Sequence, residues 1–280
     1  MKTTSLVART LLGVTCWAGL AAALAAPAAA SAAATCRAAS GDTTTALVEL
    51  YTSEGCDSCP PADRWLSHLH GEIAGRSFVA VAYHVDYWDR LGWKDRFGSA
   101  DFTARQNEQT RRQQAGFVYT PQVSIQGRDY RDWQSADHLQ RSLQSINKAP
   151  ARARIALQVV SPTTGSAAEV GVAVDAQVEP GYRGDAVLTV ALTQNGLVTE
   201  VAAGENAGKR LAHDHVVRAW QPGLAMSSGK LHKDLRFTLP PDRGALSVVA
   251  FMEDPRSGEV LQALDLSLCD GRVDEASEKP

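Results

Sequence analysis

The sequence lacks a strong excess of either charge. Its 28 Lys and Arg residues nearly balance 31 Asp and Glu residues, so the net charge is −3. Proteins that bind nucleic acid or an anionic membrane surface usually carry a clear basic excess. We therefore expect neither partner. With 44% apolar and 21% charged residues, the composition is typical of a globular protein.

Long apolar runs are also scarce, and the longest lies near the N-terminus. The run 11–26 follows Lys2 and Arg9 and precedes small residues suited to cleavage. It is short for a membrane span. We expect residues 1–34 to be a cleaved secretory signal peptide, which predicts an exported protein, periplasmic or extracellular, that keeps no integral membrane segment. The alternative is a retained membrane anchor.

Cysteine is sparse, with five residues in the whole chain. One of them, Cys16, falls within the expected signal peptide, which leaves four cysteines in the mature chain. Disulfides persist in the compartments to which proteins are exported, so we expect these four to pair. Cys56 and Cys59 are separated by two residues and form a natural local pair. We predict that the other two, Cys36 and Cys269, form a structural disulfide between the ends of the mature chain. The alternative is two unpaired thiols.

The Cys56–Cys59 pair lies between an apolar run, residues 46–52, and a helical pattern that follows Pro60 and Pro61. Proline fits the first turn of a helix, where its missing N–H costs nothing. A dithiol between a strand and a helix is typical of a thiol–disulfide centre. Because a helix start favours negative charge, we expect Cys56 to be the nucleophile and Cys59 to resolve the mixed disulfide.

Two acidic residues, Glu54 and Asp57, lie beside the dithiol in the sequence. A neighbouring carboxylate disfavours a thiolate through like-charge repulsion. A strongly oxidising disulfide depends on a greatly stabilised thiolate. The sequence therefore predicts a centre that is less oxidising than the most oxidising exported catalysts.

Strand and helix patterns alternate up to residue 150. In the order β-α-β-α-β-β-α, they lie near residues 46–52, 63–70, 77–85, 101–115, 118–125, 129–133 and 135–148. Seven β-like segments separated by turn signals follow, which predicts an all-β sandwich-like domain. We expect a first domain over residues 35–150, a second over 151–270 and a polar tail over 271–280.

The second domain contains no Ser/His/Asp elbow and no Gly-rich phosphate loop in its sequence. His213 and His215 lie two positions apart at the start of the predicted strand 214–220. We expect them on one face of a strand, because residues two apart in a strand point the same way. Two histidines alone make at most half of a metal site. We expect no resident metal or cofactor in the protein.

The order of elements, with a dithiol after the first strand and Pro121 opening the third, resembles the thioredoxin fold over roughly residues 44–148. Four blocks, VELYTSEGCDSCPPAD, AYHVDYWDRLGWKDRF, FTARQ and VYTPQ, resemble an exported bacterial family known as DUF1223, a domain of unknown function. The later stretch 204–220 resembles the same family. The resemblance therefore covers both expected domains and implies no substrate.

The thioredoxin resemblance implies roles for three further residues. It implies a cis peptide bond before Pro121, which a tight loop tolerates, and backbone hydrogen bonds from Thr120 to an extended thiol substrate. It also implies that Glu49, the one acid in the first apolar strand, is buried and relays the proton of Cys59. The alternative for Glu49 is an edge position in solvent.

The aromatic loop over residues 83–97 has two interpretations. Tyr87 and Trp88, with His84, are expected to line a substrate surface over the dithiol. Alternatively, the aromatic side chains form an apolar plug that roofs the fold or contacts the second domain. We favour the plug for Trp93.

The dithiol itself leaves three functions open. The first is thiol–disulfide exchange with a protein or a small thiol or disulfide. The second is a non-catalytic binding or accessory module in which the pair is a structural disulfide. The third is a copper carrier that holds the metal through Cys56, Cys59 and His84, since thiolate and imidazole suit copper. No oligomeric state follows from the sequence.

Overall fold

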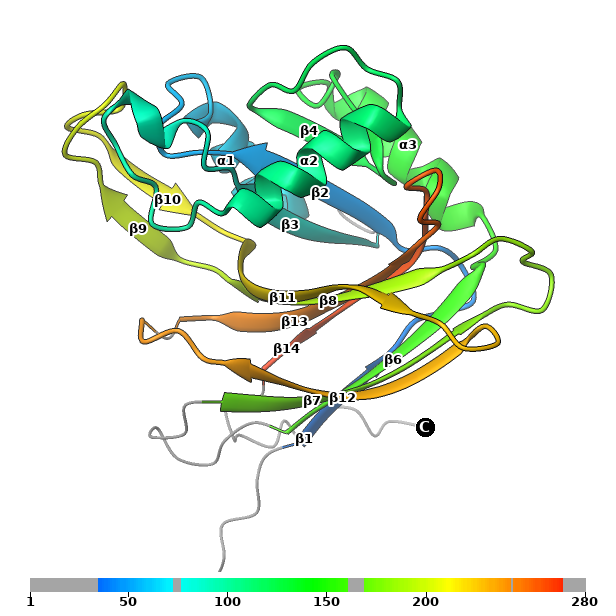
Figure 1. Cartoon of the computed structure of the whole chain (residues 1–280). Helices are drawn as coiled ribbons and strands as arrows, with labels where there is room; N and C mark the ends of the chain where they lie inside the picture. The colour runs from blue at the N-terminus through cyan, green and yellow to red at the C-terminus, as the bar shows by residue number, and fades with distance from the viewer. Residues whose placement is uncertain (1–34, 73–76, 161–168, 243, 269–280) are drawn as a thin grey trace, which may run out of the picture. The chain divides into compact units, whose positions relative to one another are not determined.

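The structure is a computed structural model, and it describes residues 35–72, 77–160, 169–242 and 244–268. The expected signal peptide, Cys269 and the polar tail lie outside the described residues. Within the described part, the fold is a mixture of α and β with more residues in strands than in helices, arranged in two large sheets and a set of three α-helices (Figure 1). The coarse class expected from the sequence is therefore confirmed.

The larger sheet has eight strands in the order β14-β13-β8-β11-β3-β2-β4-β5. Their bounds are β2 Ala46–Thr52, β3 Phe78–His84, β4 Gln122–Ile125, β5 Arg128–Asp129, β8 Val187–Gln194, β11 Val216–Ala225, β13 Leu246–Glu253 and β14 Val260–Ser267. Parallel pairing of Val216 with Ala82 joins β11 to β3. The strands come from both sides of residue 150, and the domain boundary expected there stays a prediction.

The smaller sheet has the order β1-β6-β7-β12. Its strands are β1 Thr35–Ala39, β6 Ala153–Val160, β7 Glu169–Val178 and β12 Lys230–Thr238. Exposed and buried positions alternate along β7, as expected for a strand with one face on a core. Its buried residues Val170, Val172 and Val174 share one apolar cluster with Leu188 and Val190 of β8, so the two sheets pack face to face here.

The helices are α1 Pro60–Glu72, α2 Ala100–Arg112 and α3 Ala136–Lys148. Leu66 of α1 and Leu143 of α3 pack in one cluster with Leu50 of β2. Phe102 of α2 packs in another cluster with Tyr51. Because neighbouring strand residues point to opposite faces, the even-numbered residues of β2 face α1 and the odd-numbered residues face α2. This division decides which acidic residues lie near the dithiol.

The predicted order of the first seven elements is confirmed, from β2 through α3. The prediction missed β1 and a hairpin of β9 Leu197–Glu200 with β10 Arg210–His213. The expected strand at 214–220 begins only at Val216, because His215 has a positive φ of 58° and breaks the run. The expectation that His213 and His215 share one strand face is therefore wrong. None of the described helices has the length and apolarity needed to cross a membrane.

Candidate functional site

Cys56 and Cys59 form a disulfide at the point where β2 gives way to α1. Their Cα atoms are 5.4 Å apart, and neither side chain is exposed to solvent. The turn is closed by the Cys56 amide, which donates to the carbonyl of Ser53 over 3.2 Å. The Cys59 carbonyl accepts from Ala62 at 2.9 Å, so helix hydrogen bonding starts at Cys59 itself. The expected local pair is confirmed, and it lies at a helix start.

Two side chains from distant segments hold the dithiol turn in place. Trp88 packs on Gly55 so closely that a Cβ atom at Gly55 would lie 3.0 Å from the Trp88 Cβ. Asn206 donates from Nδ2 to the carbonyls of Glu54 and Cys56, both at 2.8 Å. Asn206 is itself buried. The turn is therefore clamped between the loop after β3 and the segment before β10.

The exposed side of the turn consists of Asp57 and Ser58. The Ser58 hydroxyl lies 3.4 Å from the Cys56 sulfur, and the Asp57 amide donates to a carboxylate oxygen of Glu205 at 3.3 Å. The Cys56 sulfur therefore contacts an exposed residue, although the sulfur itself is covered.

The peptide bond between Thr120 and Pro121 is cis, as predicted. Trp88 donates from Nε1 to the Thr120 hydroxyl at 2.8 Å and also packs on Gly55. The structure therefore brings together the proline loop, the aromatic loop and the dithiol turn. Tyr87 lies beside Trp88, with ring centroids 6.3 Å apart.

A buried cluster of ionisable side chains lies against the same turn. We call it the His213 cluster, and it comprises Glu54, Asp63, His84, Asp95 and His213, of which none is more than 6% exposed. Its members come from the dithiol turn, α1, the end of β3, the aromatic loop and β10. Thr52 and His84 pair across β2 and β3 on the face that α1 covers, which places His84 on the same side of the sheet as Asp63.

Within this cluster, His213 lies between two carboxyl groups. Its Nε2 atom is 3.5 Å from Glu54 Oε1, and its Nδ1 atom is 3.8 Å from Asp63 Oδ2. The ring also meets His84 edge to face, with centroids 4.9 Å apart. His84 in turn holds Asp95 through Nδ1 and Oδ2, which are 2.6 Å apart.

Burial and neighbouring charges shift the protonation of these groups in different directions. Burial disfavours the charged imidazole of His84, yet the Asp95 carboxylate outweighs it and raises the pKa of His84. Burial likewise opposes ionisation of Asp95, but His84 holds the pKa of Asp95 below its usual value. Burial raises the pKa of Asp63 against the opposing effects of His213 and His84. For Glu54, burial is outweighed by His213, and the pKa is lowered.

Several polar atoms of the His213 cluster lack a hydrogen-bond partner among the described residues. They are Glu54 Oε1, Asp63 Oδ2, His84 Nε2 and both ring nitrogens of His213. Buried polar atoms are ordinarily paired, and unpaired ones next to perturbed acids and bases are typical of functional sites. The cluster is therefore a candidate for acid–base chemistry beside the disulfide.

The described residues include no group of three or more His, Cys, Asp or Glu side chains arranged to hold a metal ion. For the copper set of Cys56, Cys59 and His84, the two sulfurs are bonded to each other and His84 Nδ1 is held by Asp95. His84 is also fully buried, so it does not line an open surface as expected from the sequence.

Glu49 is buried, as expected, but in a different cluster. We call it the Arg105 cluster, and it comprises Glu49, Arg105, Gln109, Ser124 and Glu253. Glu49 Oε1 accepts two hydrogen bonds from Arg105, at 3.0 and 2.8 Å, and Oε2 accepts from Gln109 at 2.8 Å and from Ser124 at 3.2 Å. Since odd-numbered residues of β2 face α2, the structure does not bring Glu49 to Cys59.

The structural disulfide expected between Cys36 and Cys269 stays a prediction. Cys36 lies on β1, and Cys269 is outside the described residues.

Asp63, Asp95 and Asn206 were not predicted from the sequence as site residues, and His213 was considered only as half of a metal site. A signal for them existed, because all four fall within three stretches that resemble one family: 48–63, 82–97 and 204–220. These stretches lie far apart in sequence and meet around the dithiol, since Asn206 bonds to Cys56 across 150 positions.

Comparison with known proteins gives a family and a fold. A crystal structure of a structural-genomics target from Agrobacterium tumefaciens shares 24% identity at a TM-score of 0.56, over 84% of this chain and 100% of that one. The HBP35 protein of Porphyromonas gingivalis shares 16% identity at a TM-score of 0.61, over 86% and 80%. No curated protein sequence matches the chain. Residues 47–253 match DUF1223, described as a protein of unknown function. This chain belongs to the DUF1223 family.

Proposed function

We propose that this protein is an exported, thioredoxin-like thiol–disulfide exchange protein that acts through Cys56 and Cys59. One observation carries the proposal: the Cys56–Cys59 disulfide starts α1 and is linked through Trp88 to the cis Thr120–Pro121 loop. A helix start lowers the cost of a thiolate, which is the reactive form. The substrate class is a protein or a small molecule that carries a thiol or a disulfide.

The exchange proceeds in two steps, each of which is the attack of a thiolate on a disulfide sulfur. A substrate thiolate attacks the Cys56 sulfur, a new S–S bond forms, and the Cys56–Cys59 bond breaks. Cys59 leaves with the electron pair. A second substrate thiolate then attacks the substrate sulfur of the mixed disulfide and releases Cys56. The protein disulfide is reduced to two thiols, and the two substrate thiols become a disulfide.

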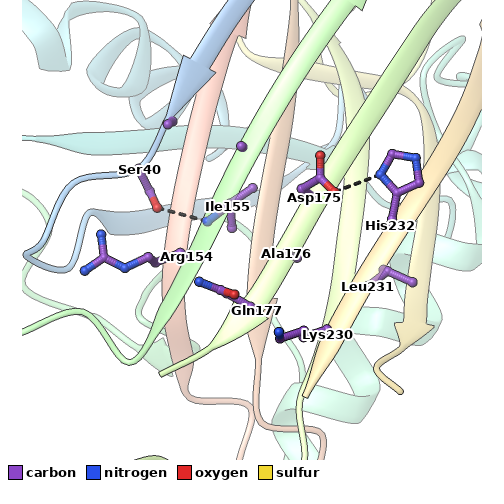
Figure 2. A pocket seen from close by; sticks show the side chains of 11 residues that line it. Ser40, Arg154, Ile155, Asp175, Ala176, Gln177, Lys230, Leu231 and His232 are labelled. Carbon is purple, nitrogen blue, oxygen red and sulfur yellow. Dashed lines mark hydrogen bonds and ion pairs between the residues drawn. The ribbon is translucent and has the colours of Figure 1, made fainter. Parts of the chain in front are cut away.

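A second candidate is a binding module in which the disulfide is a structural cross-link. The complete burial of both cysteine side chains favours it. The outer face of the smaller sheet also carries a hollow of about 470 Å³ that contains none of the residues around the disulfide. Figure 2 shows its charged side chains, among them Arg154 and an ion pair of Asp175 with His232 at 2.8 Å.

Native thiol labelling separates the two candidates. The folded protein is treated with a mild excess of reduced glutathione and then with a thiol-reactive label, and labelled peptides are assigned by mass spectrometry. Exchange predicts rapid labelling at Cys56 and Cys59, together with catalysis of insulin reduction that Cys56→Ser abolishes. A disulfide that resists glutathione and a protein without insulin-reducing activity would leave the binding module as the better description.

A further inference from the structure

Opening the disulfide creates a proton demand inside the protein. When a substrate thiolate attacks Cys56, the sulfur of Cys59 leaves with the electron pair of the broken bond. Cys59 is fully buried, and a buried thiolate is unfavourable unless it is paired or protonated. A proton donor near Cys59 would remove this cost, and the reverse reaction would need the same group as an acceptor.

Asp63 is placed to meet this demand. It lies four residues after Cys59 on α1, and its amide donates to the Cys59 carbonyl at 3.2 Å. Residues four apart lie on one face of a helix, about 6 Å from each other. The Asp63 side chain is 6% exposed, and its Oδ2 atom has no hydrogen-bond partner among the described residues. Burial raises the pKa of Asp63, which keeps a proton on it at a higher pH than on a surface aspartate.

His213 connects Asp63 to a second carboxyl group. One ring nitrogen faces Asp63 Oδ2 at 3.8 Å and the other faces Glu54 Oε1 at 3.5 Å. An imidazole between two carboxyl groups takes a proton at one nitrogen and releases one from the other. The remaining charged groups that face this line are His84 from β3 and Asp95 from the aromatic loop, which pair with each other.

We propose that Asp63 gives its proton to Cys59 as the disulfide opens, and that His213 positions the Asp63 carboxyl group for this transfer. This proposal deepens the proposed exchange function and rests on it. Asp63 acts on the leaving sulfur, and His213 acts through Asp63. In the reverse reaction Asp63 accepts the proton of the Cys59 thiol while the disulfide forms.

The test is the pH dependence of disulfide opening. The rate of reduction by dithiothreitol is followed in wild type, Asp63→Asn, Asp63→Glu and His213→Gln, between about pH 5 and pH 9. Asp63→Asn is expected to slow reduction on the order of 100-fold and to remove the part of the pH profile that belongs to the carboxyl group. Asp63→Glu restores a carboxyl group and is expected to recover much of both. His213→Gln is expected to have a smaller effect.

The matched control is Asp137→Asn, which removes an exposed aspartate from the first turn of α3. This variant tests whether the loss of any negative charge at a helix start slows reduction of the disulfide. We expect its reduction rate to equal that of wild type. If Asp63→Asn, or Asp63→Ser where the asparagine variant does not fold, reproduces the wild-type rate and profile, the proton role of Asp63 is overturned. If wild type itself is not reduced, the exchange function fails instead, so the two failures are distinguishable.

Discussion

Two buried charged clusters lie on opposite faces of β2, and they are built differently. In the Arg105 cluster, both carboxylate oxygens of Glu49 accept hydrogen bonds, and Glu253 accepts from Arg105 at 2.9 Å and from Arg112 at 3.3 Å. In the His213 cluster, five polar atoms lack a partner among the described residues. A satisfied buried network holds a structure in place, whereas an unsatisfied one is free to change its protonation.

The positions of the clusters fit this difference. The Arg105 cluster joins α2 to β2 and β13, strands from opposite sides of the expected domain boundary. The His213 cluster surrounds the dithiol turn, where chemistry is proposed. Burial of an acid does not by itself identify a catalytic residue. Which partners the acid has, and which face of the strand it occupies, decide between a structural and a chemical role.

The largest expected effect is a loss of stability when the Arg105 cluster is broken. Arg105→Met leaves Glu49 and Glu253 buried without their main cation, and we expect the free energy of unfolding in urea to fall by about 3–5 kcal/mol. Arg111→Gln is the control, because this arginine of the same helix is 73% exposed. It should change stability by less than about 0.5 kcal/mol. Equal losses in the two variants would contradict the structural role of Arg105.

An intermediate effect is expected where the chain closes over the dithiol. Asn206→Ala leaves the buried carbonyls of Glu54 and Cys56 without their Asn206 donor, which costs about 1–3 kcal/mol. Because the clamp on the turn is lost, reduction of the disulfide by glutathione should also become faster. Asn107→Ala, at an exposed position of α2, should change neither quantity. A destabilised Asn206→Ala protein whose disulfide opens no faster would argue against a covering role for this segment.

The smallest expected effect is on the pH dependence of stability. Because burial raises the pKa of Asp63, the folded protein holds a proton that the unfolded chain has released, and stability falls as pH rises through that interval. Asp63→Asn removes this loss, so its unfolding free energy relative to wild type should increase as the pH rises above about 4, the pKa of an aspartate in the unfolded chain. For Asp137→Asn, the unfolding free energy relative to wild type should not change with pH over this interval. Parallel curves for wild type and Asp63→Asn would show that Asp63 is not perturbed.

Features set by nearby residues were predictable from the sequence. The two-residue spacing of Cys56 and Cys59, with the prolines after them, predicted the disulfide and the helix start. The cis bond before Pro121 followed from the order of elements and the resemblance to thioredoxin. These inferences needed only local geometry or a short alignment of motifs.

Features that depend on strand face and long-range packing were not predictable. Every residue of β2 is buried, so its sequence has no alternation from which to tell the face of Glu49 from the face of Thr52. The hairpin that delivers His213 was missed, because β9 and β10 have four residues each and the run towards β11 breaks at His215. Only the fold itself brings residues 204–213 to the dithiol.

The central claim is that the Cys56–Cys59 disulfide takes part in exchange, and its reduction potential tests this most directly. The folded protein is equilibrated in glutathione buffers of graded potential, and the fraction of labelled Cys56 and Cys59 is measured. An exchange role predicts a two-electron transition above about −300 mV and below about −120 mV, the value of a strongly oxidising centre. A pair that stays oxidised throughout, down to about −300 mV, would be a structural cross-link and would contradict the account.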